Sequence, residues 1–226
     1  IAFGKLLNCG QTCVAPDYIL VERSVKDEFL VYLKKWIVRM YGADATENDA
    51  YVKMINQKHF DRVTGLIDPE KVIFGGGRNE RTMQIQPTIL DDVTAEDAVM
   101  QEEIFGPIFP ILPVDSMAEA EEFIRKREKP LALYLFTQNK ALAERFLRYV
   151  PFGGGCINDT VVHVSGAEIP FRGVGQSGMG GAYHGKAGFD TFSHQKVVLK
   201  QSNEIELPLR YAPYKKKLKW VRTLMR

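Results

Sequence analysis

The feature of this sequence that most constrains its fold is an alternation of short apolar runs with longer segments whose apolar residues recur at helical spacing. Tyr18–Glu22 and Lys71–Phe74 are apolar runs of strand length. Ser24–Tyr41, with Ser24 as the expected N-cap, and Asn56–Ile67 carry apolar residues at the three- and four-residue spacing of a helix face. Strands that alternate with helices favour a parallel sheet covered by helices. We therefore predict an α/β protein built on a parallel sheet.

The alternation continues in the second half of the chain. Ile108–Val114 is predicted as a strand, and Ser116–Arg127 as a helix whose capping box is completed by Glu119. Leu131–Thr137 is predicted as the next strand, and Asn139 as the cap of the next helix. Residues 151–188 are rich in Gly, Ser and Pro, which predicts a long loop region.

Composition excludes several classes of protein. The 226 residues are 45% hydrophobic, and 30 basic residues nearly balance 28 acidic ones, so no nucleic-acid partner is indicated. Three cysteines are too few and odd in number for a disulfide framework, so we expect free thiols and a cytoplasmic location. No apolar run reaches the length of a membrane span, and no targeting leader is recognisable. The chain begins at Ile1 in a segment that looks helical, so we expect that sequence has been removed upstream.

Cys13 stands in a turn between a predicted helix and a predicted strand. Gly10 lets the chain change direction, and Pro16 stops a helix from continuing. A thiol exposed there is a good nucleophile, and its attack on an aldehyde gives a thiohemiacetal that can lose hydride. The alternative is that Cys13 is a small buried apolar residue, as many intracellular cysteines are.

A family resemblance decides between these two interpretations. The segment reads Asn8-Cys9-Gly10-Gln11-Thr12-Cys13-Val14-Ala15-Pro16-Asp17-Tyr18. It resembles the catalytic-cysteine segment of aldehyde dehydrogenases, and the Ala-Pro-Asp-Tyr continuation resembles their class 3 branch. The resemblance implies that Cys13 is the catalytic nucleophile and that its own backbone N–H helps to hold the oxyanion. It implies no catalytic role for Cys9, which we interpret, like Cys156, as a packing residue.

Met100–Pro107 contains two adjacent glutamates, an aromatic residue and a Gly-Pro turn. Adjacent glutamates on a loop are usually solvated surface charges. The segment nevertheless resembles the Glu-x-Phe-Gly-Pro motif of the same family, which implies that Glu103 binds the nicotinamide-side ribose hydroxyls and that Phe105 packs near the nicotinamide. A carboxylate can accept two hydrogen bonds from a vicinal diol. The resemblance thus implies NAD or NADP as cofactor, without choosing between them, and no metal site is predicted.

The glycine-rich region gives a third match. Asn158, the downstream His163 and the loop Ile169–Gly180 resemble the family pattern, which implies that Asn158 organises the loop beneath Cys13. His163 in an apolar stretch is typical of a packed residue rather than a general base. A phosphate-binding loop is disfavoured because no strand enters the glycines and no helix follows them. Arg172 replaces the usual Gly, and an extra residue lies near Gly181, so we expect an altered substrate funnel.

The resemblance divides the chain into three segments. Residues 1–188 correspond to a catalytic domain, 189–207 to a terminal strand and oligomerisation segment that includes Val197–Leu199, and 208–226 to a basic tail. We expect a homodimer. The tail mixes basic and aromatic residues, so contact with an anionic membrane surface and a solvated disordered tail are both open.

The implied function is that of the catalytic half of an NAD(P)-dependent aldehyde dehydrogenase. Such an enzyme oxidises an aldehyde to a carboxylic acid through a thiohemiacetal and a thioester, and class 3 suggests medium to long aliphatic or aromatic aldehydes. In the family the nucleotide-binding domain, the general-base segment and the oxyanion-hole Asn lie upstream of the point matching Ile1. We therefore expect a missing N-terminal half as partner. Two alternatives remain open, a non-catalytic truncated paralogue that acts as an association module and a cysteine-dependent esterase.

Overall fold

The chain forms two compact units. The computed structural model describes residues 1–206, 208–214 and 216–224. The first unit comprises Ile1–Phe192 and the second Ser193–Arg226. The segment boundary placed after residue 188 by the sequence falls inside the helix α6 (Gly185–Thr191). The separation of the two units therefore comes after that helix.

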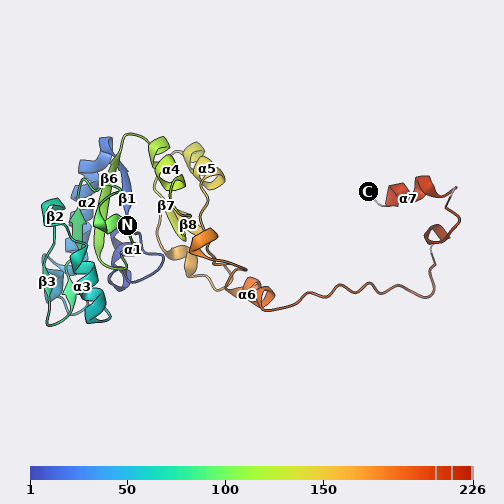
Figure 1. The fold of residues 1–226 in the computed structure, drawn as a ribbon, viewed down its shortest axis with the longest axis horizontal. Helices are drawn as coiled ribbons and strands as arrows, with labels where there is room; N and C mark the ends of the chain where they lie inside the picture. The colour runs from blue at the N-terminus through green and yellow to red at the C-terminus, as the bar shows by residue number, and fades with distance from the viewer. Residues whose placement is uncertain (207, 215, 225–226) are drawn as a thin grey trace. The chain divides into compact units, whose positions relative to one another are not determined.

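A four-stranded sheet forms the centre of the first unit (Figure 1). Its order is β1 (Ile19–Glu22), β6 (Ile108–Val114), β5 (Thr88–Leu90) and β2 (Val72–Phe74). β6 runs parallel to both β1 and β5, which confirms the predicted parallel α/β sheet. β2 is antiparallel to β5, contrary to the simple strand–helix alternation. The reason is the connection, because a short hairpin of β3 (Arg78–Asn79) and β4 (Gln84–Ile85) joins these strands where a parallel pair needs a crossover, usually a helix.

Two further strands, β7 (Ala132–Leu135) and β8 (Gly154–Ile157), form a parallel pair of their own. Figure 1 shows this pair together with the helices α4 (Met117–Arg125) and α5 (Lys140–Tyr149). In the described part of the chain, β7 pairs only with β8, and β1 pairs only with β6. Each of these strands therefore has one edge without a strand partner.

The remaining helices cover the sheet and connect its strands. They are α1 (Ala2–Leu6), α2 (Arg23–Tyr41) and α3 (Gln57–Gly65). Single 3₁₀ turns complete the unit: η1 (Leu7–Gly10), η2 (Ala45–Glu47), η3 (Pro69–Lys71), η4 (Ala98–Met100), η5 (Val162–Val164) and η6 (Gly175–Ser177).

Helix caps follow the sequence with two exceptions. The side chains of Asn139 and Ser116 accept bonds from backbone N–H groups of the first turns of α5 and α4, as predicted. Glu119 does not complete a capping box, because its carboxylate accepts from the N–H of Asp115 at 2.6 Å. Ser24 is not an N-cap, because α2 begins at Arg23 directly after β1.

The core lies between the sheet and its helices. Ile89, Ile108 and Ile111 of the central strands are fully buried, and they pack in one cluster with Leu33 of α2 and Phe60 of α3. Burial of one such side chain contributes about 1.5–3 kcal/mol relative to its exposure. This core fixes the end of the sheet at which the parallel strands β1 and β6 begin, and the loops that carry the candidate site lead into these strands there.

The second unit contains the turn η7 (Pro208–Arg210) and the helix α7 (Leu218–Leu224). Val197–Leu199, the predicted strand of the oligomerisation segment, has no regular secondary structure in the single chain. The backbone groups of a strand need a partner strand, and none of the described strands pairs with these residues, so this strand stays a prediction. None of the described helices has the length and apolarity needed to cross a membrane.

Candidate active site

Cys13 lies in the loop between η1 and β1, and its side chain is exposed. The turn before it is tightly constrained: Asn8, Cys9 and Gly10 all have positive φ. A Cβ placed on Gly10, whose φ is 74°, would lie 2.2 Å from the carbonyl oxygen of Gly106. Only glycine permits this approach, so Gly10 brings the cysteine loop against the Glu103–Gly106 loop.

The loop around Cys13 is held on both sides. Gln11 donates its side-chain N–H to the carbonyl of Lys53 at 3.1 Å and accepts the N–H of Ile55 at 2.9 Å. On the other side, the Tyr134 hydroxyl of β7 donates to the carbonyl of Val14 at 2.6 Å. The thiol is therefore exposed on a loop whose backbone is fixed, as an aligned nucleophile requires.

The other two cysteines have different surroundings. Cys9 is fully buried, and its thiol donates to the Tyr51 hydroxyl at 3.3 Å. Burial raises the pKa of Cys9 to about 11, and the hydrogen bond with Tyr51 and the charge of Lys5 oppose this rise. A thiol of that pKa is almost entirely protonated near neutral pH and is a poor nucleophile. The interpretation of Cys9 as a packing residue is confirmed.

Cys156 is partly buried and lies in strand β8, which falls inside the stretch 151–188 that the sequence predicted as loop. Its sulfur is 3.7 Å from Nδ1 of His163, whose ring packs edge-on against Tyr134. Burial lowers the pKa of His163, so the ring is neutral at pH 7. The structure thus places His163 in packing contacts between strand and loop, in line with the prediction.

Glu103 and Phe105 lie in the loop that leads into β6. The N–H of Ile104 donates to the Asp17 carboxylate at 3.0 Å, and Arg62 of α3 donates to the carbonyls of Ile104 and Glu103 at 2.6 and 3.3 Å. Phe105 adopts a positive φ of 48° and leaves 37% of its surface exposed. The loop is therefore fixed through its backbone while both predicted side chains remain accessible.

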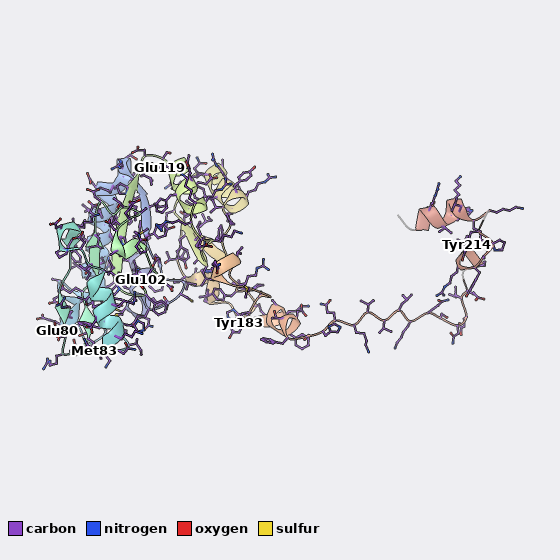
Figure 2. The ribbon with its side chains drawn as sticks, in the orientation of Figure 1. Glu80, Met83, Glu102, Glu119, Tyr183 and Tyr214 are labelled. Atoms are coloured by element: carbon purple, nitrogen blue, oxygen red, sulfur yellow. The ribbon has the colours of Figure 1, made fainter. Side chains whose placement is uncertain are left out.

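The two adjacent glutamates have different partners. Glu102 forms an ion pair with Arg62 at 3.4 Å, and Figure 2 marks its place beside α3. Glu103 is exposed, yet neighbouring atoms displace part of its hydration and raise its pKa. The Asp17 carboxylate raises that pKa further, whereas Arg62 and Lys5 oppose the rise.

Cys13 and Glu103 line one cavity of about 760 Å³. Asp17, the residues of β1 and the residues of β7 with Tyr134 line the same cavity. Phe105 is not part of the lining. The structure therefore brings together the predicted nucleophile and the predicted ribose-binding carboxylate, 90 positions apart in the chain.

Sequence reasoning assigned one polar residue incorrectly. Asn158 does not support the loop of Cys13: its side-chain amide bonds both the N–H and the carbonyl of Thr137, at 2.7 and 2.9 Å, and so joins the ends of β8 and β7. Tyr134 makes the contact with the cysteine loop instead. No local pattern reveals this, because a Tyr in a strand is typical of ordinary sheet packing.

Other cavity residues were not singled out from the sequence. Gln176 and Ser177 of the glycine-rich loop line the cavity, whereas Arg172, the expected modifier of the substrate funnel, does not. Arg172 is exposed, and its carbonyl oxygen lies 2.4 Å from where a Cβ on Gly153 would be. Gly153 therefore permits close backbone packing against this loop.

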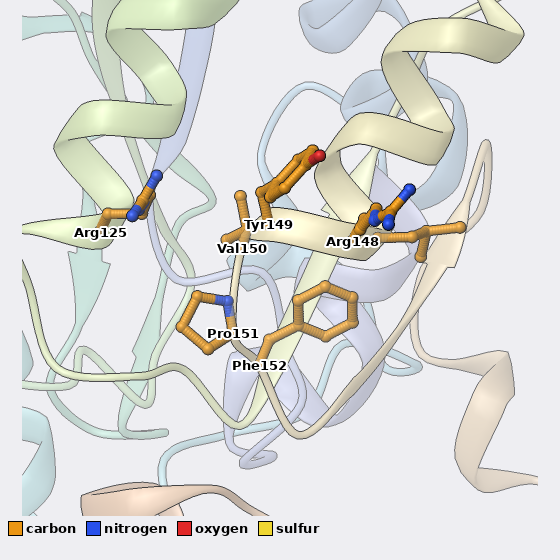
Figure 3. A pocket seen from close by; sticks show the side chains of 7 residues that line it. Arg125, Arg148, Tyr149, Val150, Pro151 and Phe152 are labelled. Carbon is orange, nitrogen blue, oxygen red and sulfur yellow. The ribbon is translucent and has the colours of Figure 1, made fainter.

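A second hollow of about 670 Å³ lies at the end of α5 (Figure 3). Its lining combines Arg125 of α4 with Leu147, Arg148, Tyr149, Val150, Pro151 and Phe152. It contains neither a thiol nor a carboxylate. Among the described residues, no group of three or more His, Cys, Asp or Glu side chains could hold a metal ion.

The fold and this site define an α/β protein in which an exposed thiol and a carboxylate share one cavity at the end of a sheet. Residues 1–198 match the model of the aldehyde dehydrogenase family. Because the match covers most of the sequence, the chain belongs to that family.

Individual relatives agree with this assignment. The chain is 46% identical over 228 residues to the 4,4'-diaponeurosporen-aldehyde dehydrogenase of Staphylococcus aureus, covering 100% of this chain and 50% of that protein. It is 49% identical over 215 residues to the dimeric NADP-preferring aldehyde dehydrogenase of Rattus norvegicus, covering 94% and 47%. A solved structure described as the substrate-bound state of Staphylococcus aureus AldH superposes with a TM-score of 0.92 at 45% identity, covering 100% and 49%. The chain thus spans about half the length of these relatives.

Proposed function

We propose that this chain is the catalytic half of an NAD(P)-dependent aldehyde dehydrogenase. The observation that carries the proposal is the shared cavity of Cys13 and Glu103. Hydride transfer requires the aldehyde carbon held by the thiol to meet the nicotinamide ring whose ribose the carboxylate holds, so both side chains must face one site.

In the proposed reaction Cys13 does the covalent chemistry. Its sulfur adds to the carbonyl carbon, the thiol proton leaves, and the carbonyl oxygen becomes the oxyanion of a thiohemiacetal. The backbone N–H of Cys13 is the expected donor to that oxygen. Loss of hydride to the cofactor leaves a thioester on Cys13, and water then cleaves the carbon–sulfur bond to release the carboxylic acid and the thiol.

The residues present fit the nicotinamide end of NAD or NADP. Glu103 offers an accessible carboxylate at the cavity, and Phe105 offers an accessible ring two positions later. When bound, the cofactor supplies the hydride acceptor. The rat relative is named as NADP-preferring, and either dinucleotide presents the same ribose hydroxyls to Glu103.

The upstream half of the enzyme is the expected partner. Among the described residues, β1 and β7 each have one edge without a strand partner, and residues of both strands line the same cavity. Unpaired strand edges expose backbone N–H and C=O groups that favour a further strand. The helix α1 followed by β1 would complete a parallel strand–helix–strand crossover if a strand preceded α1. We therefore infer that a strand of the other half fills the space between β1 and β7.

The experiment that tests the proposal measures NAD(P)H formation from aliphatic and aromatic aldehydes by this chain, with and without an added N-terminal half of a class 3 relative. We expect turnover only with both halves, and none with Cys13→Ser. Turnover by the complemented Cys13→Ser variant would refute the assignment of the nucleophile. Aldehyde oxidation by this chain alone would refute the role given to the other half.

The ribose-binding role has its own matched control in the neighbouring glutamate. Glu103→Gln should lower kcat/KM roughly tenfold to hundredfold in the complemented enzyme, because a hydrogen bond to a charged group contributes about 1.5–3 kcal/mol. Glu102→Gln should have little effect, since Glu102 pairs with Arg62. Equal losses in the two variants would contradict this role for Glu103.

A further inference from the structure

Lys5 of α1 is buried to 1% exposure among the apolar residues of the first unit. Its ammonium donates to the backbone carbonyl of Asp17 at 3.3 Å. Such burial is costly for a charged group, and an apolar residue of the same length would fill the space without that cost. The position therefore requires an explanation other than packing.

Asp17 joins Lys5 to the candidate site. Its backbone carbonyl accepts from Lys5, while its carboxylate accepts the N–H of Ile104 at 3.0 Å. Asp17 follows Cys13 in the same loop, and Ile104 follows Glu103 directly. One residue thus connects the buried ammonium, the cysteine loop and the loop of the ribose-binding candidate.

The charges around Glu103 act in opposite directions. The Asp17 carboxylate disfavours an ionised Glu103, whereas Lys5 and Arg62 favour it. Arg62 is shared, because it also pairs with Glu102 and bonds two loop carbonyls. Lys5 has no ion pair within reach among the described residues, so its charge acts on Asp17, Glu103 and Cys9 through the protein interior.

We propose that Lys5 is a positioning residue of the Cys13–Glu103 site: by donating to the Asp17 carbonyl it fixes the segment after Cys13 against the Glu103 loop, and it places a positive charge near Glu103. Only the ligand of Glu103, a ribose diol, rests on the proposed function; the positioning itself rests on the contacts of this chain. An ionised carboxylate accepts two hydrogen bonds, whereas a protonated one must donate.

Burial lowers the pKa of Lys5 to about 8, and this value agrees with the role. The neighbouring charges of Asp17, Cys9 and Glu103 oppose that lowering. At neutral pH the amine therefore remains mostly protonated, and its positive charge acts on Asp17 and Glu103.

The test follows the titration of the Glu103 side-chain carboxyl by carbon NMR in the chain as it stands. Lys5→Met should raise the pKa of Glu103, and Asp17→Asn should lower it. Lys35→Met, which removes an exposed lysine from α2, should leave it unchanged. If Lys5→Met and Asp17→Asn shift the pKa of Glu103 in opposite directions, general loosening of the structure cannot be the cause.

A folded Lys5→Met variant with an unchanged Glu103 titration would overturn the proposal. If Lys5→Met does not fold, the same titration of the wild-type chain provides the test. Deprotonation of Lys5 should produce a second step in the chemical shift of the Glu103 carboxyl carbon, and absence of that step would overturn the proposal. In the complemented enzyme, Lys5→Met should raise the KM for NAD(P) most strongly at acidic pH. A shifted Glu103 titration with an unchanged KM would support the positioning role and refute the ribose-binding role.

Discussion

At the scale of single residues, Cys9 and Cys13 show how surroundings decide what a thiol can do. The two cysteines are four positions apart. Cys9 is buried and hydrogen-bonded to Tyr51, whereas Cys13 is exposed in the cavity that it shares with Glu103. The difference arises from the left-handed turn at Asn8–Gly10, which directs the two side chains into different environments.

This contrast predicts the pattern of covalent labelling. Cys13→Ser should abolish rapid labelling by an aldehyde analogue that reacts with thiols, whereas Cys9→Ser and the further control Cys156→Ser should retain it. Mass spectrometry of the labelled peptides is the measurement. Label on Cys9 in the native chain would contradict the assignment.

Lys5 makes stability depend on pH in a defined direction. Burial lowers its pKa from 10.5 to about 8, so between these pH values the unfolded chain holds a proton that the folded chain has released. The free energy of unfolding should therefore rise with pH in this window. Below it, the buried charge costs on the order of 3 kcal/mol.

Cys9 acts in the opposite sense above pH 9, because its pKa is raised from 9.0 to about 11. The useful range for measurement is therefore pH 8 to 9. Denaturant unfolding of the wild type should show the rise there, and Lys5→Met should lack it. The same slope in both proteins would exclude Lys5 as its source.

At the scale of elements, the cysteine loop and the Glu103–Gly106 loop pack closely at Gly10. Gly10→Ala would place a Cβ 2.2 Å from the Gly106 carbonyl oxygen at a φ of 74°, so backbone must move. We expect destabilisation of more than about 1 kcal/mol and slower labelling of Cys13, because positive φ and overlap act together.

The matched control is Gly65, at the end of α3. A Cβ there meets no atom within 4 Å, and its φ is ordinary, so Gly65→Ala should be neutral or stabilise by up to about 1 kcal/mol. Thermal and denaturant unfolding of both variants provide the comparison. A Gly10→Ala variant as stable as Gly65→Ala would contradict the close approach of the two loops.

At the scale of the whole molecule, the proposed N-terminal half supplies a strand between the four-stranded sheet, at the unpaired edge of β1, and the two-stranded pair, at the unpaired edge of β7. Amides on an unpaired edge exchange with solvent faster than amides in a hydrogen-bonded ladder. Binding of the N-terminal half should slow hydrogen exchange in Ile19–Glu22 and Ala132–Leu135. Exchange in β5, between β6 and β2, should change little, and equal protection of all strands would argue against an inserted strand.

Much of this organisation follows from sequence alone, because it depends on local signals. Helical spacing and the caps Ser116 and Asn139 predicted α4 and α5, and the apolar run at Ile108–Val114 predicted β6. Cys13, Glu103 and Phe105 were identified by motifs that each lie within a dozen residues. The error at Ser24 occurred at a boundary, because α2 begins at Arg23 directly after β1 and leaves no turn in which Ser24 could cap it.

Sequence by itself determined most of the succession of strands and helices and named the candidate site residues, since periodicity, capping and short family motifs act over a few residues. Only the tertiary structure decided that β2 runs antiparallel, that Tyr134 rather than Asn158 holds the cysteine loop, and that Lys5, Asp17 and Arg62 surround Glu103. The physical reason is that hydrogen-bond partners and electrostatic neighbours are set by distance in space. No local pattern records that distance.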